Sequence, residues 1–168
     1  MIVASRSLVV ATPARQEFFD VTDEVTAFIA ESGLADGVVV ASTQHTSCCV
    51  IIQEESEDVT YYGTQLILQD TLNVLAKIAP PTRNEGQYLH PGPIHIEFEA
   101  AEDLTTGRHP SWGLNTDGHI ISSILGRSVT VPVQAGQAVL GEFGRIYLGD
   151  LDAVRDRERT VVFTVMGR

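Results

Sequence analysis

Residues 38–52 read VVVASTQHTSCCVII, two apolar runs rich in β-branched residues on either side of a polar turn. Valine and isoleucine fit the pleated surface of a sheet, so the runs at 38–42 and 48–52 predict two strands. His45 lies between them, at a bend where a side chain can face a pocket. Cys48 and Cys49 are neighbours, and neighbouring side chains on a strand point to opposite faces, so we expect no disulfide between them. We interpret them as small apolar strand residues in a reducing compartment.

Similar short runs recur along the chain, each bounded by Gly, Pro or charged clusters. Together they predict a largely antiparallel sheet system. Besides the pair above, the predicted strands cover 8–10, 95–99, 129–133, 138–140, 145–148 and 160–166.

Two helices are predicted in the first half of the chain. The hydroxyl of Thr22 can cap the start of the first helix, and Gly33 can end it. A longer helix is predicted over 58–77, because Pro80 forbids continuation and apolar residues recur at three- and four-residue spacing. This helix should cover one face of the sheet. Its apolar residues are Val59, Tyr62, Leu66, Leu68, Leu72 and Leu75.

A third, short helix is predicted to begin after Asn115 or Asp117 and to run to Leu125, with Gly126 as its C-terminal cap. This assignment places His119 in the first helical turn. The chain is therefore expected to have an α+β fold, in which about three helices pack on the sheet system.

The segment 82–114 is rich in Gly, Pro and His and is long for a connection inside a compact domain. Long loops of this kind are often functional. With 168 residues, 43% of them hydrophobic, the chain is expected to form one domain, 1–168, in which 82–114 is a long and partly irregular insertion.

The formal net charge of −11 argues against nucleic-acid binding, because phosphate backbones are repelled and no Lys/Arg-rich face is apparent. No apolar stretch approaches the roughly 18 residues needed to span a bilayer, and the first residues lack the pattern of a signal peptide. We therefore expect a cytoplasmic protein with neither a nucleic-acid nor a membrane partner.

All five histidines lie between His45 and His119. Neutral imidazole beside carboxylates is a common ligand set for zinc and similar metals. The chain has no Cys-x-x-Cys pair and no His-Glu-x-x-His helix, so any metal site must be assembled from distant segments. Taken alone, His45 is more simply interpreted as a structural histidine hydrogen-bonded to its neighbours.

Carboxylates near these histidines offer a second kind of chemistry. Glu54 follows an apolar strand. It is either part of the acidic first turn of the next helix or a functional carboxylate that acts as a general base or metal ligand. Asn115 and Asp117 are good helix caps, and capping alone explains their presence. It does not explain His119, since the positive end of the helix dipole disfavours a protonated imidazole. A neutral His119 could serve as a ligand or a base.

Near the C-terminus, residues 152–159 alternate acidic and basic side chains. Arg155 and Arg157 would project on the same side of an extended chain. The simpler interpretation is a solvated loop whose charges pair with one another; the alternative is a clamp for a phosphate or carboxylate.

Taken together, these motifs resemble the YjbQ family over about residues 6–167. The family pattern includes a His-Thr-Thr/Ser element, an Asn-Glu pair, a Tyr-x-His, a Gly-Asn-x-Asp-x-His helix start and a C-terminal Asp-Gly-x-Arg-x-Arg. The matching stretches are Asp20-Val21-Thr22, His45-Thr46-Ser47, Gln53-Glu54, Tyr88-Leu89-His90, Asn115 to His119, Leu125-Gly126-Arg127-Ser128, Val131-Pro132-Val133, Leu140-Gly141 and Asp152 to Arg157.

The resemblance implies a compact α+β fold that assembles as a homotrimer, with polar residues near the subunit contacts, and a weak thiamine-phosphate synthase activity in some members. The chain departs from the pattern at Gln53, at Leu114 and at Glu142-Phe143-Gly144, where the family has Thr-Trp-Gln. Its segment between His90 and Asn115 is also longer than usual and could reshape or cover a pocket.

These observations support two classes of function. The first is a small-molecule enzyme acting on a phosphorylated metabolite, in which three histidines hold a divalent metal, zinc or magnesium, and a polar group activates water or positions the substrate. The second is a non-catalytic trimer that binds a metabolite or metal. The metal ligands are expected to be His45, His90 and His119, the catalytic groups Glu54, Asn115 and Asp117, and the cofactor- or anion-binding residues Arg155 and Arg157.

Overall fold

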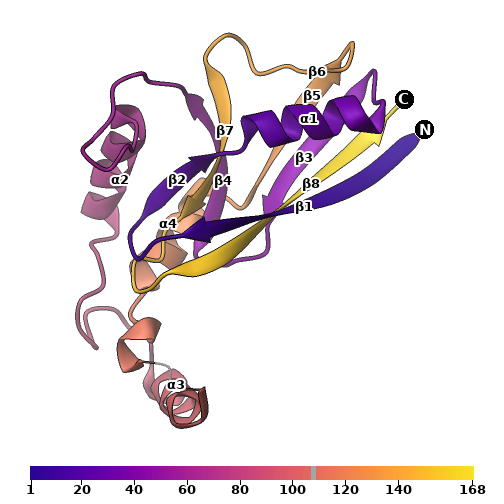
Figure 1. Cartoon of the computed structure of the whole chain (residues 1–168). Coiled ribbons are helices and arrows are strands. Elements are labelled where there is room, and N and C mark those ends of the chain that lie inside the picture. The colour runs from indigo at the N-terminus through magenta and orange to yellow at the C-terminus, as the bar shows by residue number, and fades with distance from the viewer. Residues whose placement is uncertain (107–108) are drawn as a thin grey trace.

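The computed structural model describes residues 1–106 and 109–168 and contains two antiparallel sheets (Figure 1). In the larger sheet the strand order is β1 (Ile2–Thr12), β8 (Arg157–Gly167), β3 (Gly37–Thr43), β5 (Ser128–Gln134) and β6 (Gln137–Ala138). In the smaller sheet the order is β2 (Glu17–Asp20), β7 (Gly144–Asp150) and β4 (Cys48–Glu54). The predicted antiparallel sheet system and α+β class are confirmed, although β2 has no counterpart among the predicted strands.

The main core lies between α1 (Thr22–Ser32) and the two sheets. Gly33 ends α1 with a left-handed φ of 71°, as predicted. The predicted cap is wrong, because the Thr22 hydroxyl accepts the backbone N–H of Ile146 while Asp20 accepts the N–H of Thr22. The core side chains of α1 are Val25, Phe28 and Ile29, which pack with Val39, Val50, Ile146 and Phe163 among others.

A second core lies on the other face of the smaller sheet, where α2 (Leu66–Ile78) and α4 (Thr116–Leu125) pack. Cys48 belongs to the main core and Cys49 to this second one, so their side chains do point to opposite faces. Both cysteines are free and buried, as expected. The second core contains Leu68, Leu72 and Leu75 of α2, Ile121 of α4, and Phe18, Tyr147 and Leu151.

Helix α2 begins eight residues later than the predicted start at Asp58. The preceding residues form a tight turn instead, in which Thr60 and Thr64 are hydrogen-bonded and Gly63 adopts a left-handed φ of 84°. Glycine adopts this conformation without steric strain, so the turn prevails over helical spacing. Val59 and Tyr62, predicted on the buried helical face, are therefore 54% and 67% exposed.

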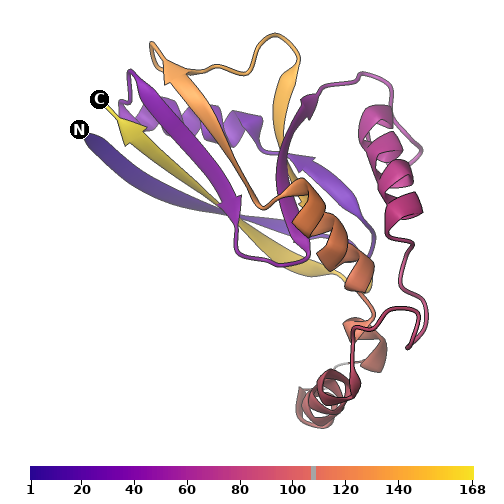
Figure 2. The same cartoon turned by 180° about the vertical axis from the view of Figure 1, so that it is seen from behind.

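The strand predicted at 95–99 is wrong, because these residues lie in α3 (Pro93–Thr106). A strand needs a neighbouring strand for its backbone hydrogen bonds, whereas a helix forms these bonds within itself. Pro93 also suits a first helical turn. α3 lies apart from the sheets, beyond the N-terminal end of α4, and a 3₁₀ turn at Pro110–Gly113 links it to α4 (Figures 1 and 2). In the described part of the chain, no helix is long and apolar enough to cross a membrane.

Candidate functional site

The N-terminal end of α4 is enclosed by the connection between β7 and β8. A Cβ on Gly118 would lie 2.6 Å from the carbonyl oxygen of Leu151, so only glycine lets this connection lie against the first helical turn. Asn115 adds a side-chain hydrogen bond of 2.7 Å to the buried carboxylate of Asp152. The start of α4 and residues 151–152 therefore form one fixed platform.

His119 lies in the first turn of α4, as predicted. Its Nδ1 is 3.0 Å from the carbonyl oxygen of Thr46. A carbonyl oxygen only accepts hydrogen bonds, so this contact requires the proton on Nδ1. In the neutral ring Nε2 then carries the lone pair, available to a proton or a metal ion.

His90 has the same tautomer for a related reason. The hydroxyl of Thr116 donates its one proton to the carbonyl oxygen of His90, at 2.7 Å. It can therefore only accept from the Nδ1 of His90, 3.0 Å away, which leaves the lone pair on Nε2. Desolvation, together with the charges of His95 and His119, lowers the pKa of His90 and favours its neutral form.

The two imidazoles lie side by side, with ring centroids 6.1 Å apart. They line an open depression of about 410 Å³ together with Thr116, Ile120 and Ser123. Two of the three predicted metal ligands are therefore close together on one surface of the protein.

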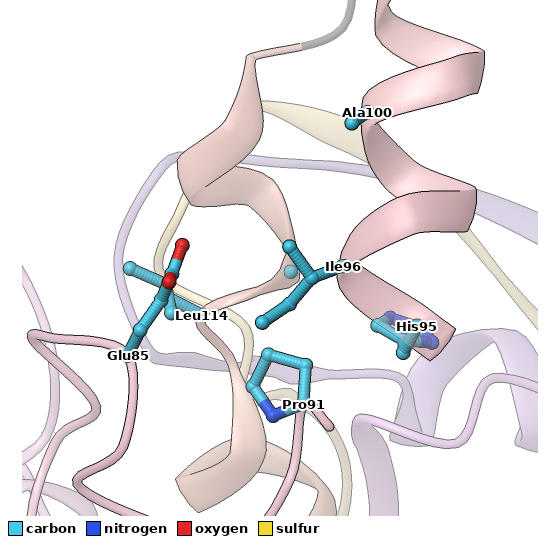
Figure 3. Close-up of a pocket in the computed structure, with 7 residues that line it drawn as sticks. Glu85, Pro91, His95, Ile96, Ala100 and Leu114 are labelled. Atoms are coloured by element: carbon cyan, nitrogen blue, oxygen red, sulfur yellow. The ribbon is translucent and has the colours of Figure 1, made fainter. Parts of the chain in front are cut away.

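His95 of α3 is a third imidazole near this surface, and its ring centroid is 4.9 Å from that of His90. It also lines a small, mainly apolar cavity of about 40 Å³, where Ile96 points toward Leu114 and Pro91 (Figure 3). That volume holds only one or a few waters, so the cavity is too small for a metabolite.

His45 does not join the pair. Its Nε2 accepts the backbone N–H of Thr160 at 3.0 Å, and its Nδ1 lies 3.5 Å from Arg159. Across residues 1–106 and 109–168, no group of three or more His, Cys, Asp or Glu side chains is arranged to hold a metal ion. In this structure His45 fits the structural interpretation, and only His90 and His119 of the predicted ligands lie together.

The neighbours of His45 form a buried ionic network. Arg159 contacts Asp150 through Nε and Nη2 at 2.9 and 3.0 Å, and also donates to the hydroxyl of Ser47. Thr12 donates to the same carboxylate at 2.6 Å. Because His45 and Ser47 are both held by β8, the network fixes the Thr46 carbonyl that orients His119.

Acid should weaken this network through His45. Burial, and then the charge of Arg159, lower the pKa of His45. Between the unfolded value near 6.5 and the lower folded value, the unfolded chain binds more protons, so we expect the free energy of unfolding to fall as the pH falls below about 7. Urea unfolding at several pH values measures this slope. His45→Gln keeps an acceptor for Thr160 and should flatten it; an unchanged slope would contradict the assignment.

Asp117 is buried and its carboxylate is fully engaged. Its Oδ1 accepts the backbone N–H and the hydroxyl of Thr82 at 3.1 and 2.7 Å, and its Oδ2 accepts Gln16 Nε2 at 3.2 Å. The same charge contributes, after burial, to a raised pKa of Tyr88. In this conformation Asp117 connects three segments of the chain, and both of its carboxylate oxygens accept hydrogen bonds from the protein.

Glu54 lies elsewhere. It is the last residue of β4, so it is not in the first turn of α2, and the seven-residue strand separates it by about 20 Å from the end that adjoins the Thr46 turn. It lines an open groove with Phe143, Arg145 and other glutamates. Within one chain, Glu54 does not reach the His90 and His119 pair.

The segment 152–159 pairs its own charges, as the simpler interpretation expects, but it is not a solvated loop. Asp152 is fully buried and binds Arg157 at 2.9 Å. Arg155 stacks on the Trp112 ring, 4.1 Å from its centroid. No sequence signal identifies the roles of Thr116 and of the Thr46 carbonyl, although both residues lie within motifs that resemble the family pattern.

The fold and the site together define an α+β protein with an imidazole pair at the start of a helix packed on a small antiparallel sheet. A family model described as UPF0047 protein YjbQ-like matches residues 6–168. The chain therefore belongs to the YjbQ-like UPF0047 family, and the resemblance drawn from its motifs is confirmed.

Curated relatives and solved structures agree with this assignment. A UPF0047 protein of Archaeoglobus fulgidus is 27% identical over 150 residues, covering 89% of this chain and 93% of the relative. The UPF0047 protein YugU of Bacillus subtilis is 26% identical over 162 residues, covering 96% and 98%. A YbjQ-like protein of unknown function from Sulfolobus solfataricus has a similar fold, with a TM-score of 0.73, 21% identity and coverage of 99% and 98%.

Proposed function

We propose that the protein is a small-molecule enzyme whose reaction centre is the pair His90 and His119, and that this pair holds a divalent metal ion. The observation that carries the proposal is the matched tautomer of the two rings. In each, Nδ1–H is bound to a protein oxygen and Nε2 keeps its lone pair. Metal-binding histidines have this arrangement, in which the second nitrogen donates to an oxygen that orients the ring.

The donor set favours zinc over magnesium. Magnesium prefers oxygen ligands, whereas imidazole nitrogen binds zinc at about 2.0–2.1 Å. A zinc ion bound by both rings would lie about 3.2 Å from each ring centroid, so centroids 6.1 Å apart are just within reach of one shared ion and would move closer in a tetrahedral site. Such an ion would act as a Lewis acid on a substrate oxygen. The rings would bind and orient it, and the open depression would admit the substrate.

Zinc titration of metal-stripped protein tests the proposal. We expect saturable binding of one zinc per chain by calorimetry, weakened at least about tenfold by His119→Ala or His90→Ala. Thr116→Val removes the acceptor of His90 Nδ1 and should also weaken binding about tenfold. Binding should weaken as pH falls, since protons compete for Nε2.

The matched control is His109→Ala, because His109 is an exposed imidazole bonded to Ser111. It should leave zinc affinity unchanged. Absence of zinc binding by the unmodified protein, or equal losses in the His109 and His119 variants, would overturn the proposal.

The substrate class is a phosphorylated metabolite, and thiamine-phosphate synthase chemistry is the narrower form of the same proposal. The alternative, a non-catalytic trimer that binds a metabolite or metal, draws support from the exposed apolar residues Val74, Ile78 and Ile124 of α2 and α4. Light scattering measures the trimer. Zinc binding without turnover of any phosphorylated substrate would favour the alternative.

A further inference from the structure

Arg155 is a cation without a carboxylate partner in the described part of the chain. Its guanidinium lies over Trp112, 4.1 Å from the ring centroid, and its Nε is buried with no hydrogen-bond partner. Stacking uses the face of a guanidinium and leaves the N–H donors on its edge available. A buried N–H without an acceptor is unfavourable, and no carboxylate of the described residues neutralises this guanidinium, so its edge favours an anion from outside the chain.

Arg157, two residues away, also has a buried donor without a hydrogen-bond partner. Its Nη1 binds Asp152 at 2.9 Å, but its Nε is also buried and without a partner. Asp152 is shared, because Arg159 lies 3.7 Å from the same carboxylate oxygen and Asn115 donates to it. Burial lowers the pKa of Arg157, Asp152 opposes that shift, and the charges of Arg159 and Arg155 add to it.

Positive charge is in excess once the exposed carboxylates are set aside. Arg155, Arg157 and Arg159 lie beside two buried carboxylates, Asp150 and Asp152, whereas Asp156, which accepts the backbone N–H of Ala14, and Glu158 are exposed to solvent. This local excess of positive charge is set in a chain of formal net charge −11. An incoming anion would supply both the missing charge and the missing hydrogen-bond acceptors.

We propose that Arg155 and Arg157, with Trp112 as the stacking platform, form an oxyanion site that binds the phosphate group of a small molecule. The turn that carries Trp112 belongs to the long segment 82–114, so this segment supplies part of the site. A phosphate has enough oxygens to accept from both guanidinium edges at once.

The site is coupled to the imidazole pair through the start of α4. Asp152 links Arg157 to Asn115, and the carbonyl oxygen of Asn115 accepts the backbone N–H of His119. The assignment of this phosphate to a substrate rests on the proposed function. The binding of an anion at Arg155 and Arg157 is independent of that function.

Trp112 is the only tryptophan in the chain, so its fluorescence reports on this site alone. We expect inorganic phosphate, titrated at constant ionic strength, to give a saturable change in the unmodified protein. Arg155→Gln should weaken binding at least tenfold, and Arg155→Lys should weaken it as well because lysine lacks the planar fork. Arg157→Lys keeps a partner for Asp152 and tests the second guanidinium without leaving a buried charge unpaired.

Arg83→Gln is the control, since Arg83 is an exposed arginine in the same long segment. It should bind phosphate like the unmodified protein. A phosphate response that is not saturable, a response of equal size to chloride, or equal affinity in Arg155→Gln would overturn the inference. Tighter binding of acetate than of phosphate would overturn the phosphate assignment.

Two further measurements separate this inference from the proposed function. His119→Ala, free of metal, should still bind phosphate, and Arg155→Gln should still bind zinc. In the unmodified protein, phosphate binding without zinc binding would refute the metal centre alone, and zinc binding without phosphate binding would refute the oxyanion site alone.

Discussion

Replacing Asp150 by alanine is expected to lower the free energy of unfolding by about 3–5 kcal/mol, because removal of one partner leaves a buried charge uncompensated. Asp150 is fully buried and receives two hydrogen bonds from Arg159 and one from Thr12. Arg159 itself is 5% exposed, so its charge cannot be solvated without local unfolding. Urea denaturation followed by circular dichroism measures the change.

Asp36→Ala is the matched control. Asp36 pairs with Arg168 at 3.8 Å, and both side chains are more than half exposed. Exposed pairs contribute about 0–1 kcal/mol, so this variant should be nearly neutral. Adding Arg159→Met to Asp150→Ala removes the uncompensated charge and should restore part of the stability. Equal effects of the Asp150 and Asp36 variants would refute the buried network.

The same network explains how Asp150, which contacts neither imidazole, sets the tautomer of His119. Arg159 binds Ser47, and Thr160 binds His45, so the Thr46 carbonyl between them is fixed against β8. This carbonyl in turn receives Nδ1–H of His119. Loss of Asp150 should therefore weaken zinc binding in the molecules that remain folded, even though Asp150 does not touch the imidazole pair.

Strands could be predicted wherever β-branched runs end at Gly, Pro or charges, because burial against a sheet selects those residues. The strand predicted at 95–99 is wrong, because this alternating pattern has no neighbouring strand to pair with. The predicted start of α2 is also wrong, because the left-handed turn at Gly63 delays the helix. Both errors concern tertiary context, which local periodicity does not contain.

The site could be located only in part, for a related reason. His90 and His119 come together because Thr116 and Thr46 orient them, and these contacts join segments distant in the chain. Motif spacing placed His45 in the same set, yet its Nε2 is occupied by a backbone N–H. Which nitrogen is available depends on hydrogen-bond partners, and a sequence does not state them.

Asp117→Ala is expected to lower the free energy of unfolding by about 2–3 kcal/mol, because several partly buried donors lose a charged acceptor. The carboxylate accepts from Thr82 and Gln16, which belong to separate segments, and it is 6% exposed. Its loss should free residues 80–88 from α4, which limited proteolysis and thermal unfolding would both detect.

Asp117→Asn separates this structural role from the catalytic role that the motif suggests. An asparagine keeps one oxygen toward Thr82 but turns a donor toward Gln16 Nε2, so stability should fall by less than in the alanine variant. If Asp117 acts structurally, zinc affinity and phosphate affinity should stay near normal in Asp117→Asn. A stable Asp117→Asn protein with turnover reduced a hundredfold or more would instead make Asp117 a catalytic residue, because a general base contributes roughly that much.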